Sequence, residues 1–97
     1  MNAVYAPRAL RDLTSIAAYL IERTPAGAAK VLAAIKSSID TLGFFPQIGR
    51  LVDDAGHGRV PVVRYPYVIF YRIDGDDIIA LHERHTSRHA IDPAAEL

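Results

Sequence analysis

Residues 63–72 read VRYPYVIFYR and carry the clearest strand signal of the chain. Successive side chains of a strand point to opposite faces, which gives two sets: Tyr67, Ile69, Tyr71 and Ile73 on one face, and Val68, Phe70 and Arg72 on the other. Both sets are largely apolar, whereas a strand with one face in water alternates apolar and polar residues. The pattern therefore predicts a central strand covered on both faces. Helices are expected on one side, and the C-terminal tail, a second copy or a partner protein on the other.

Two further strands are predicted around this one. Residues 59–65 are rich in Val, and Pro66 marks a break before the central strand. Residues 74–77, with the sequence DGDD, are a hairpin turn signal, and a third strand is expected from residue 78 to about residue 84. The preceding segment, residues 44–58, is rich in Pro, Gly and Asp and is predicted to be a loop.

The N-terminal half has a different periodicity. Residues 2–6 predict a short strand, and apolar residues then recur at helical spacing from Pro7 to about residue 23. A second helical stripe fills residues 25–42, with Thr24 as its cap and Gly43 as its expected end. The order β-α-α-β-β-β predicts a single α+β domain over residues 1–97, in which a helical hairpin packs on a small antiparallel sheet.

Composition narrows the class of protein. The chain has 97 residues, with eleven basic and eleven acidic side chains and no Cys. The zero net charge argues mildly against a protein whose main partner is nucleic acid, because phosphate contacts supply most of that affinity. The absence of Cys, the charged N-terminal segment and the lack of any 18-residue apolar window predict a cytoplasmic protein without a membrane span.

Four segments together resemble a known family. They are APRALRDLTSIAAYL (6–20), PQIGR (46–50), YPYVIFYRI (65–73) and LHERHTSR (81–88). With this order of elements, nearly the whole chain resembles the RelE/ParE toxin superfamily of bacterial type II toxin–antitoxin modules. Two departures are visible. Ala6 stands where the family often has a Ser or Thr cap, and the last segment fits either His82-Glu83-Arg84 or His85-x-x-Arg88.

The resemblance implies one of two activities. RelE-like members cleave messenger RNA on the ribosome, ParE-like members bind DNA gyrase, and an antitoxin protein neutralises both. Cleavage of RNA without a metal needs side chains that move protons and hold negative charge. Alignment of the RelE-like strand onto residues 67–71 puts Val68 where those ribonucleases have Arg, and the preceding strand has Pro61 and no Lys. The resemblance therefore favours a ParE-like toxin that blocks replication by binding gyrase, without catalysis or cofactor.

Candidate site residues follow from this interpretation. We expect an antitoxin to bind the face around Val68 and Phe70, with its acidic groups paired to Arg64 and Arg72. The alternative is a RelE-like, metal-independent messenger RNA endoribonuclease acting on the ribosome through Arg64, His85 and Arg88. A third possibility is an inert stabilisation protein that still binds its antitoxin.

Basic and aromatic side chains of the predicted sheet have two interpretations each. Arg59, Arg64 and Arg72 suit a phosphate cleft, but they suit an acidic partner or nearby acids better. Tyr65, Tyr67 and Tyr71 suit stacking on bases, although we favour a place in the core with their hydroxyls at its edge.

Three remaining features are interpreted as structural. His82, His85 and His89 have no Cys to complete a metal site, and none is expected. Residues 74–77 are too short for a calcium loop and predict a solvated hairpin tip. Gly49 of PQIGR is expected to supply a backbone φ that other residues resist, in a turn from helix to sheet.

Overall fold

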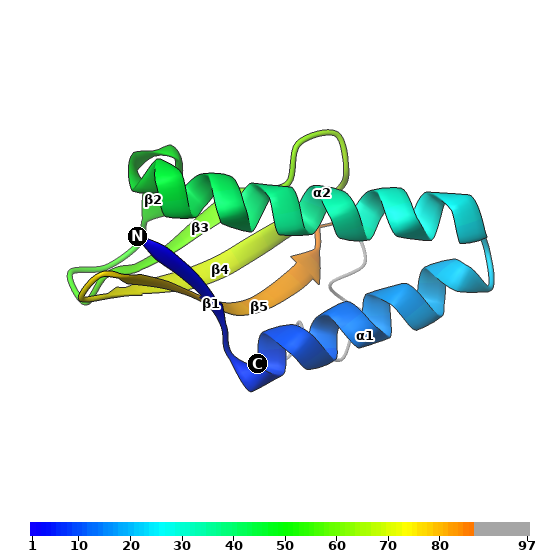
Figure 1. Ribbon diagram of the computed structural model, residues 1–97, viewed down its shortest axis with the longest axis horizontal. Coiled ribbons are helices and arrows are strands. Elements are labelled where there is room, and N and C mark those ends of the chain that lie inside the picture. Colours follow the sequence, from blue (N-terminus) through cyan, green and yellow to red (C-terminus); the bar gives the residue numbers. More distant parts are fainter. Residues whose placement is uncertain (87–97) are drawn as a thin grey trace.

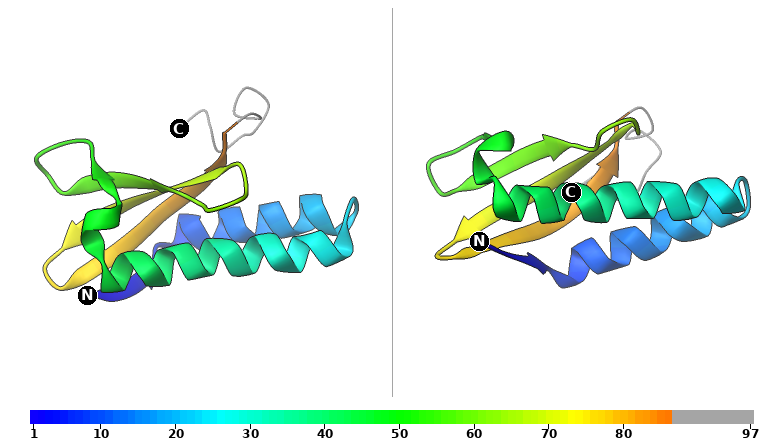
Figure 2. Two further views of the ribbon diagram at one scale, coloured as in Figure 1. Left: turned by 90° about the horizontal axis from the view of Figure 1, so that it is seen from above. Right: turned by 45° about the horizontal axis from the view of Figure 1, so that its top comes forward.

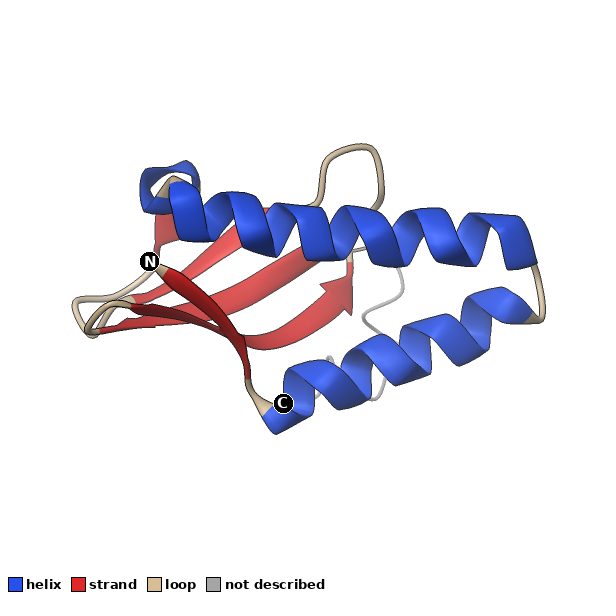
Figure 3. Ribbon diagram, viewed as in Figure 1, coloured by secondary structure: helices blue, strands red, loops and turns tan. Residues whose placement is uncertain are grey.

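The computed structural model describes residues 1–86, and its elements follow the predicted order with two short additions, a 3-10 turn and a two-residue strand (Figures 1 and 3). In chain order the elements are β1 (Asn2–Tyr5), α1 (Pro7–Ile21), α2 (Pro25–Phe44), the 3-10 turn η1 (Pro46–Ile48), β2 (Arg50–Leu51), β3 (His57–Pro61), β4 (Tyr67–Asp74) and β5 (Asp77–His85). The segment predicted as a loop thus holds η1, β2 and the start of β3. No helix of the described part is both long and apolar enough to cross a membrane.

The α+β class is confirmed, and the sheet is mixed rather than wholly antiparallel. Its strand order is β1-β5-β4-β3-β2, so β4 lies at the centre as predicted. The strands β2 to β5 are antiparallel, whereas β1 joins the edge of β5 in parallel, with Asn2 opposite Asp77. Both helices cover the same face of the sheet (Figure 2), and the opposite face is called the outer face below.

The capping and termination signals predicted for the two helices can be compared with the structure of their ends. Helix α1 begins at Pro7 without a side-chain cap, because Ala6 has no side-chain oxygen, and Thr24 Oγ1 caps α2 by accepting from Gly27 N–H at 3.3 Å. Helix α2 runs through Gly43, which was predicted to end it. Gly43 is buried, a Cβ there would lie 3.1 Å from Met1 O, and its own oxygen accepts from the Met1 ammonium at 2.9 Å. Gly43 therefore provides room for the N-terminus rather than a helix stop.

The alternation of β4 is confirmed. Tyr67, Ile69 and Tyr71 are buried against the helices, and Val68 and Phe70 are half-buried on the outer face. The core that they join comes from both helices and from β3 and β5. Its other fully buried large apolar side chains are Ile35, Ile39, Leu42 and Ile78.

Gly49 has a structural role other than the predicted one. Its φ of −82° and ψ of 164° are extended backbone that any residue adopts, so the expectation of an unusual φ was wrong. A Cβ at Gly49, or at Gly58 of β3, would instead collide with the hydroxyl end of Tyr71. The two glycines leave room for the largest fully buried side chain of the core.

The strand predicted over residues 59–65 ends early. It stops at Pro61, and the chain turns back to β4 over residues 62–66, with Val62 N–H bonded to Tyr67 O at 2.9 Å. Arg64 lies in this turn with a φ of 75°, in the left-handed region that side chains other than glycine rarely adopt. Arg64 is therefore a turn residue and not part of the strand.

Candidate functional site

The outer face is assembled from three strands. Cross-strand partners in an antiparallel pair share a face, so the register places Arg59 and His82 on either side of Phe70, and Pro61 and Arg84 on either side of Val68. Arg72 lies farther along β4, opposite His57 of β3. The result is an apolar centre surrounded by cationic side chains.

A bulge in β5 determines which residues reach this face. Phe70 pairs with His82 and Tyr71 with Ala80, so Leu81 is the extra residue of the bulge. Simple alternation from Ile78 and Ala80 would have buried His82 and exposed Glu83. The bulge reverses this, because His82 lies on the outer face while Glu83 is only 1% exposed.

Phe70 is the centre of a stacked cluster. The His82 imidazole lies on its ring with centroids 4.5 Å apart and planes 17° apart, and the Arg84 guanidinium carbon lies 5.0 Å from the ring centroid. Burial, and then the positive charges of Arg8 and Arg84, lower the pKa of His82 to about 4. His82 is therefore neutral near pH 7, and arginines carry the positive charge around Phe70.

Acids offset only part of that charge. Arg72 Nη1 lies 3.4 Å from Asp74 Oδ2, and His57 Nδ1 lies 2.9 Å from Asp53 Oδ2. Within residues 1–86, neither Arg59 nor Arg84 forms an ion pair, and Arg84 Nε is buried without a hydrogen-bond partner. The outer face thus has uncompensated positive charge next to apolar area, which suits an acidic and partly apolar partner.

Glu83 lies beneath this face, between β5 and α1. Its carboxyl oxygens have no hydrogen-bond partner in the described part of the chain, while its N–H donates to Asp12 Oδ2 at 3.0 Å. Burial, and then the charge of Asp12, raise the pKa of Glu83 to about 8. The carboxyl is therefore mostly protonated at neutral pH. Nothing in the sequence distinguishes this acid from a solvated one, because its burial depends on the bulge.

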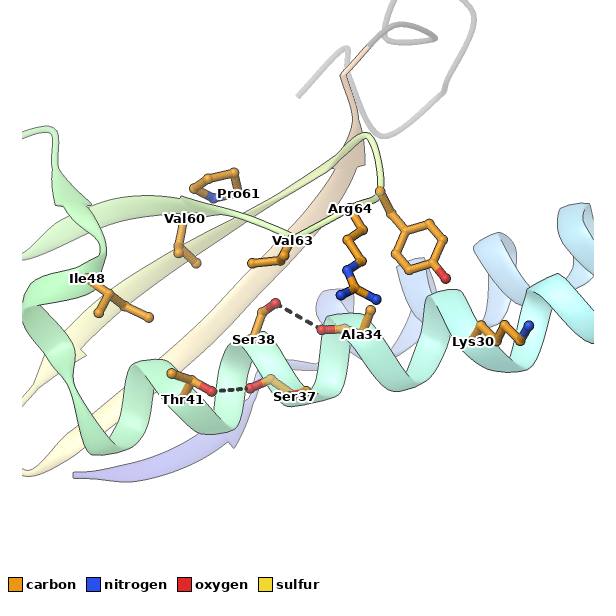
Figure 4. Close-up of a pocket in the computed structure, with 11 residues that line it drawn as sticks. Lys30, Ala34, Ser37, Ser38, Thr41, Ile48, Val60, Pro61, Val63 and Arg64 are labelled. Atoms are coloured by element: carbon orange, nitrogen blue, oxygen red, sulfur yellow. Dashed lines mark hydrogen bonds between the residues drawn. The ribbon is translucent and has the colours of Figure 1, made fainter.

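The predicted antitoxin-binding residues separate into two places. Val68, Phe70 and Arg72 lie together on the outer face, as their alternation along β4 required. Arg64 is apart from them in the 62–66 turn, where its side chain points toward α2 (Figure 4).

The predicted ribonuclease residues are not assembled on the outer face. His85 is paired with Tyr67, on the side of the helices, and its ring meets the Tyr67 ring edge-on with centroids 5.0 Å apart. Arg64 lies in the turn, and Arg88 lies outside the described residues, as does His89. Tyr67 and Tyr71 belong to the core, as interpreted from the sequence.

A groove of about 540 Å³ lies between α2 and the 62–66 turn (Figure 4). Helix α2 contributes one wall, including Lys30, Ala34 and Ser38, and Val63 and Arg64 contribute the other. Sequence reasoning missed this groove because residues 59–65 were interpreted as a continuous strand. Pro66 was already interpreted as a break, and it favours extended backbone at Tyr65, so it did not indicate a turn at the residues before it.

Comparisons with known proteins agree with one another. The family described as the ParE toxin of type II toxin-antitoxin system, parDE, matches residues 3–90. “Putative toxin Y4kP” of Sinorhizobium fredii is 35% identical over 79 residues, which cover 80% of this chain and 82% of that protein. Toxin RelE2 of Caulobacter vibrioides is 34% identical over 87 residues, which cover 90% of this chain and 97% of that protein.

Among solved structures, a chain of the chromosomal ParDE TA system from P. aeruginosa has the same fold. The TM-score is 0.77 at 22% identity, over 88% of this chain and 95% of that one. The family match extends over most of the sequence, including both helices and the four strands that follow them. This chain belongs to the ParE toxin family of type II toxin–antitoxin systems.

Proposed function

We propose that this ParE-family toxin stops growth by binding DNA gyrase in the cytoplasm and blocking replication, and that its cognate antitoxin neutralises it by covering the outer face. In this proposal the toxin is a binding protein and turns over no substrate. In this proposal the antitoxin contacts are Val68, Phe70 and Arg72, together with Arg59 and Arg84, the cross-strand neighbours of Phe70 and Val68.

The observation that carries the proposal is the chemistry around Phe70. Arginines hold charge but do not exchange protons near pH 7. His82, the imidazole in this cluster, is stacked and has a pKa of about 4, and Glu83 is turned into the core. Acid–base cleavage of RNA requires groups that exchange protons near the working pH. Binding an acidic protein segment requires only the charge and the apolar area.

The proposal is tested by DNA supercoiling with purified gyrase and antitoxin-free toxin. We expect supercoiling to fall, or cleaved DNA to accumulate, at toxin concentrations near that of the enzyme. Prior addition of the antitoxin is expected to restore supercoiling. Full supercoiling by a toxin preparation that still stops cell growth would contradict the proposed target.

A RelE-like endoribonuclease is the second candidate. Two observations favour it: a relative named Toxin RelE2 matches 90% of the chain, and His57, held by Asp53, lies opposite Arg72 on the outer face. His57 was not among the sequence candidates Arg64, His85 and Arg88. Cleavage of messenger RNA that requires ribosomes, and that is lost when His57 is changed to Ala, would support this second function.

A further inference from the structure

Strand β5 loses one of its two neighbouring strands before it ends. Strand β1 pairs with β5 only from Asp77 to Ala80, and the last bond on that edge runs from Ala6 N–H to Ala80 O at 2.9 Å. Strand β5 continues to His85, whereas the chain after β1 turns into α1 (Figure 1). Beyond Ala80, β5 is therefore paired only with β4 within residues 1–86.

The backbone of Glu83 faces this open edge of β5. Opposite residues of an antiparallel pair alternate between bonded and non-bonded pairs, and Thr86 N–H donates to Pro66 O at 2.8 Å. By this alternation His82 and Arg84 bond to β4, and Glu83 directs its N–H away from β4. A strand edge that lies against a helix needs an acceptor for such an N–H, because a buried backbone group without a partner destabilises the fold.

Asp12 of α1 is that acceptor. Its Oδ2 lies 3.0 Å from the Glu83 nitrogen, and its side chain is only 12% exposed. Arg8 Nε lies 3.9 Å from the same oxygen and offsets part of its charge. Asp12 lies between Ala9 and Ile16, the two buried residues of α1, at the spacing that puts all three on one side of the helix. An acid on the buried side of a helix is costly unless it is hydrogen-bonded, so its position there indicates a specific partner rather than contact with water.

The two residues that flank Glu83 carry part of the outer face. The His82 ring stacks on Phe70, and the Arg84 guanidinium lies over the same ring. The bulge before His82 interrupts the β4–β5 ladder on one side of this segment, and β5 ends one residue after Arg84 on the other. The bond to Asp12 therefore restrains a short segment of β5 from the side that β4 does not cover.

We propose that Asp12 is a positioning residue for the outer face: it takes the place of a strand on the open edge of β5 and thereby holds His82 and Arg84 beside Phe70. Asp12 belongs to a helix on the opposite side of the sheet (Figure 2), so it acts on the outer face through the Glu83 backbone and not by touching a partner. The inference deepens the proposed function, and only its consequence for antitoxin and gyrase binding rests on that function.

Amide hydrogen exchange followed by NMR tests this role residue by residue. Asp12→Ala removes the acceptor, and the His82 and Arg84 amides are then expected to exchange at least tenfold faster relative to the Ile39 amide of the core than in the wild-type toxin. Asp12→Asn retains a side-chain oxygen and is expected to restore slow exchange. Ile16→Val is the matched control, because it trims the buried side of the same helix without removing the bond to β5, and it is expected to change all these amides by one factor.

Two further NMR measurements observe the contacts themselves. The His82 pKa of about 4 is expected to rise toward its ordinary value of 6.5 in Asp12→Ala and to stay low in Asp12→Asn, because the imidazole leaves the Phe70 ring only when the acceptor is lost. Scalar coupling between the Glu83 amide nitrogen and the Asp12 carboxyl carbon is expected in the wild-type toxin, and it needs no variant that folds. Absence of this coupling would overturn the inference. So would uniform acceleration of exchange in Asp12→Ala, because Asp12 would then stabilise the whole fold.

Binding by the same variants separates this inference from the proposed function. Asp12→Ala is expected to bind the antitoxin at least tenfold more weakly in titration calorimetry, and Asp12→Asn to bind normally. Unchanged affinity together with faster exchange of the β5 end would contradict the proposed antitoxin contacts and leave the positioning role of Asp12 in place. Failure of the wild-type toxin to inhibit gyrase would contradict the proposed target alone.

Discussion

The Phe70 ring and the His82 imidazole lie face to face, with centroids 4.5 Å apart, at the centre of a sheet face that no described element covers. The bulge at Leu81 makes this contact possible, because it brings His82 opposite Phe70. A partner that covers this face must match both an apolar centre and the arginines around it. Val68 lies beside Phe70 in this apolar centre.

Val68→Asp is predicted to weaken antitoxin binding by about tenfold or more, corresponding to about 1.4 kcal/mol, because the carboxylate replaces apolar contact area and repels the acidic groups proposed for the antitoxin. Titration calorimetry of the purified toxin against its antitoxin measures the change. Ile21→Asp places the same charge at an exposed position at the end of α1, on the opposite side of the sheet, and is expected to bind normally. Unchanged affinity in a folded Val68→Asp variant would remove this surface from the antitoxin interface.

Glu83 is predicted to make the stability of the toxin fall as the pH rises toward 8. Its folded pKa of about 8 is above the usual value of 4.5, so the folded state binds more protons between these values. The contribution of Glu83 to the free energy of unfolding is fully present below pH 4.5 and is lost as the pH rises through 8. Its size is of the order of a few kcal/mol.

Chemical denaturation between pH 6.5 and 8.5 isolates the Glu83 effect. His82 has a lowered pKa of about 4, so its contribution changes in the opposite direction and below pH 6.5. Glu83→Gln is expected to flatten the pH dependence in the upper window. An equal slope in the variant and the wild-type toxin would mean that Glu83 is ionised in the folded protein at neutral pH.

Tyr71 and the two glycines beside it predict a second stability effect. Gly49→Ala is expected to cost about 1–3 kcal/mol, because the added methyl group would collide with the Tyr71 hydroxyl end. Tyr71→Phe removes an oxygen that is buried without a partner in the described part of the chain, so alone it is expected to be nearly neutral. Thermal unfolding of the double variant is expected to show partial rescue. Equal losses with and without the hydroxyl would mean that the backbone at Gly49, and not the close approach of Tyr71, is the constraint.

Local patterns in the sequence were sufficient for most of the fold and for part of the site. Alternation along residues 67–73 placed Val68, Phe70 and Arg72 together correctly, since a regular strand needs no tertiary information to fix its faces. The bulge at Leu81, the turn at Arg64 and the burial of Glu83 were not predictable in this way. Each depends on strand pairing between residues distant in the chain, and a shift of one residue reverses which side chains face the core.

Arg64→Gly is predicted to leave the stability of the toxin unchanged or to raise it by up to about 1 kcal/mol. Left-handed backbone costs about 1–2 kcal/mol in residues with a Cβ, and the greater flexibility of glycine in the unfolded chain offsets part of the gain. Arg64→Val is expected to be less stable than the wild-type protein, because a β-branched residue resists this φ more strongly. Thermal unfolding of the three proteins checks the order. A loss of stability in Arg64→Gly would mean that the Arg64 side chain stabilises the turn.

The last prediction distinguishes gyrase binding from RNA cleavage within living cells. If the toxin acts by binding gyrase, Arg64→Ala, His85→Ala and His57→Ala are each expected to stop growth when expressed without the antitoxin, because a binding toxin needs no group for acid–base chemistry. If it cleaves messenger RNA, loss of a proton-transfer group is expected to reduce cleavage by about 10²–10⁴-fold and to abolish toxicity. Growth curves, together with supercoiling and ribosome-dependent cleavage assays on the same variants, measure both. Toxicity that disappears only in His57→Ala would place the chemistry on the outer face opposite Arg72, at a residue that the resemblance to ribonucleases did not identify.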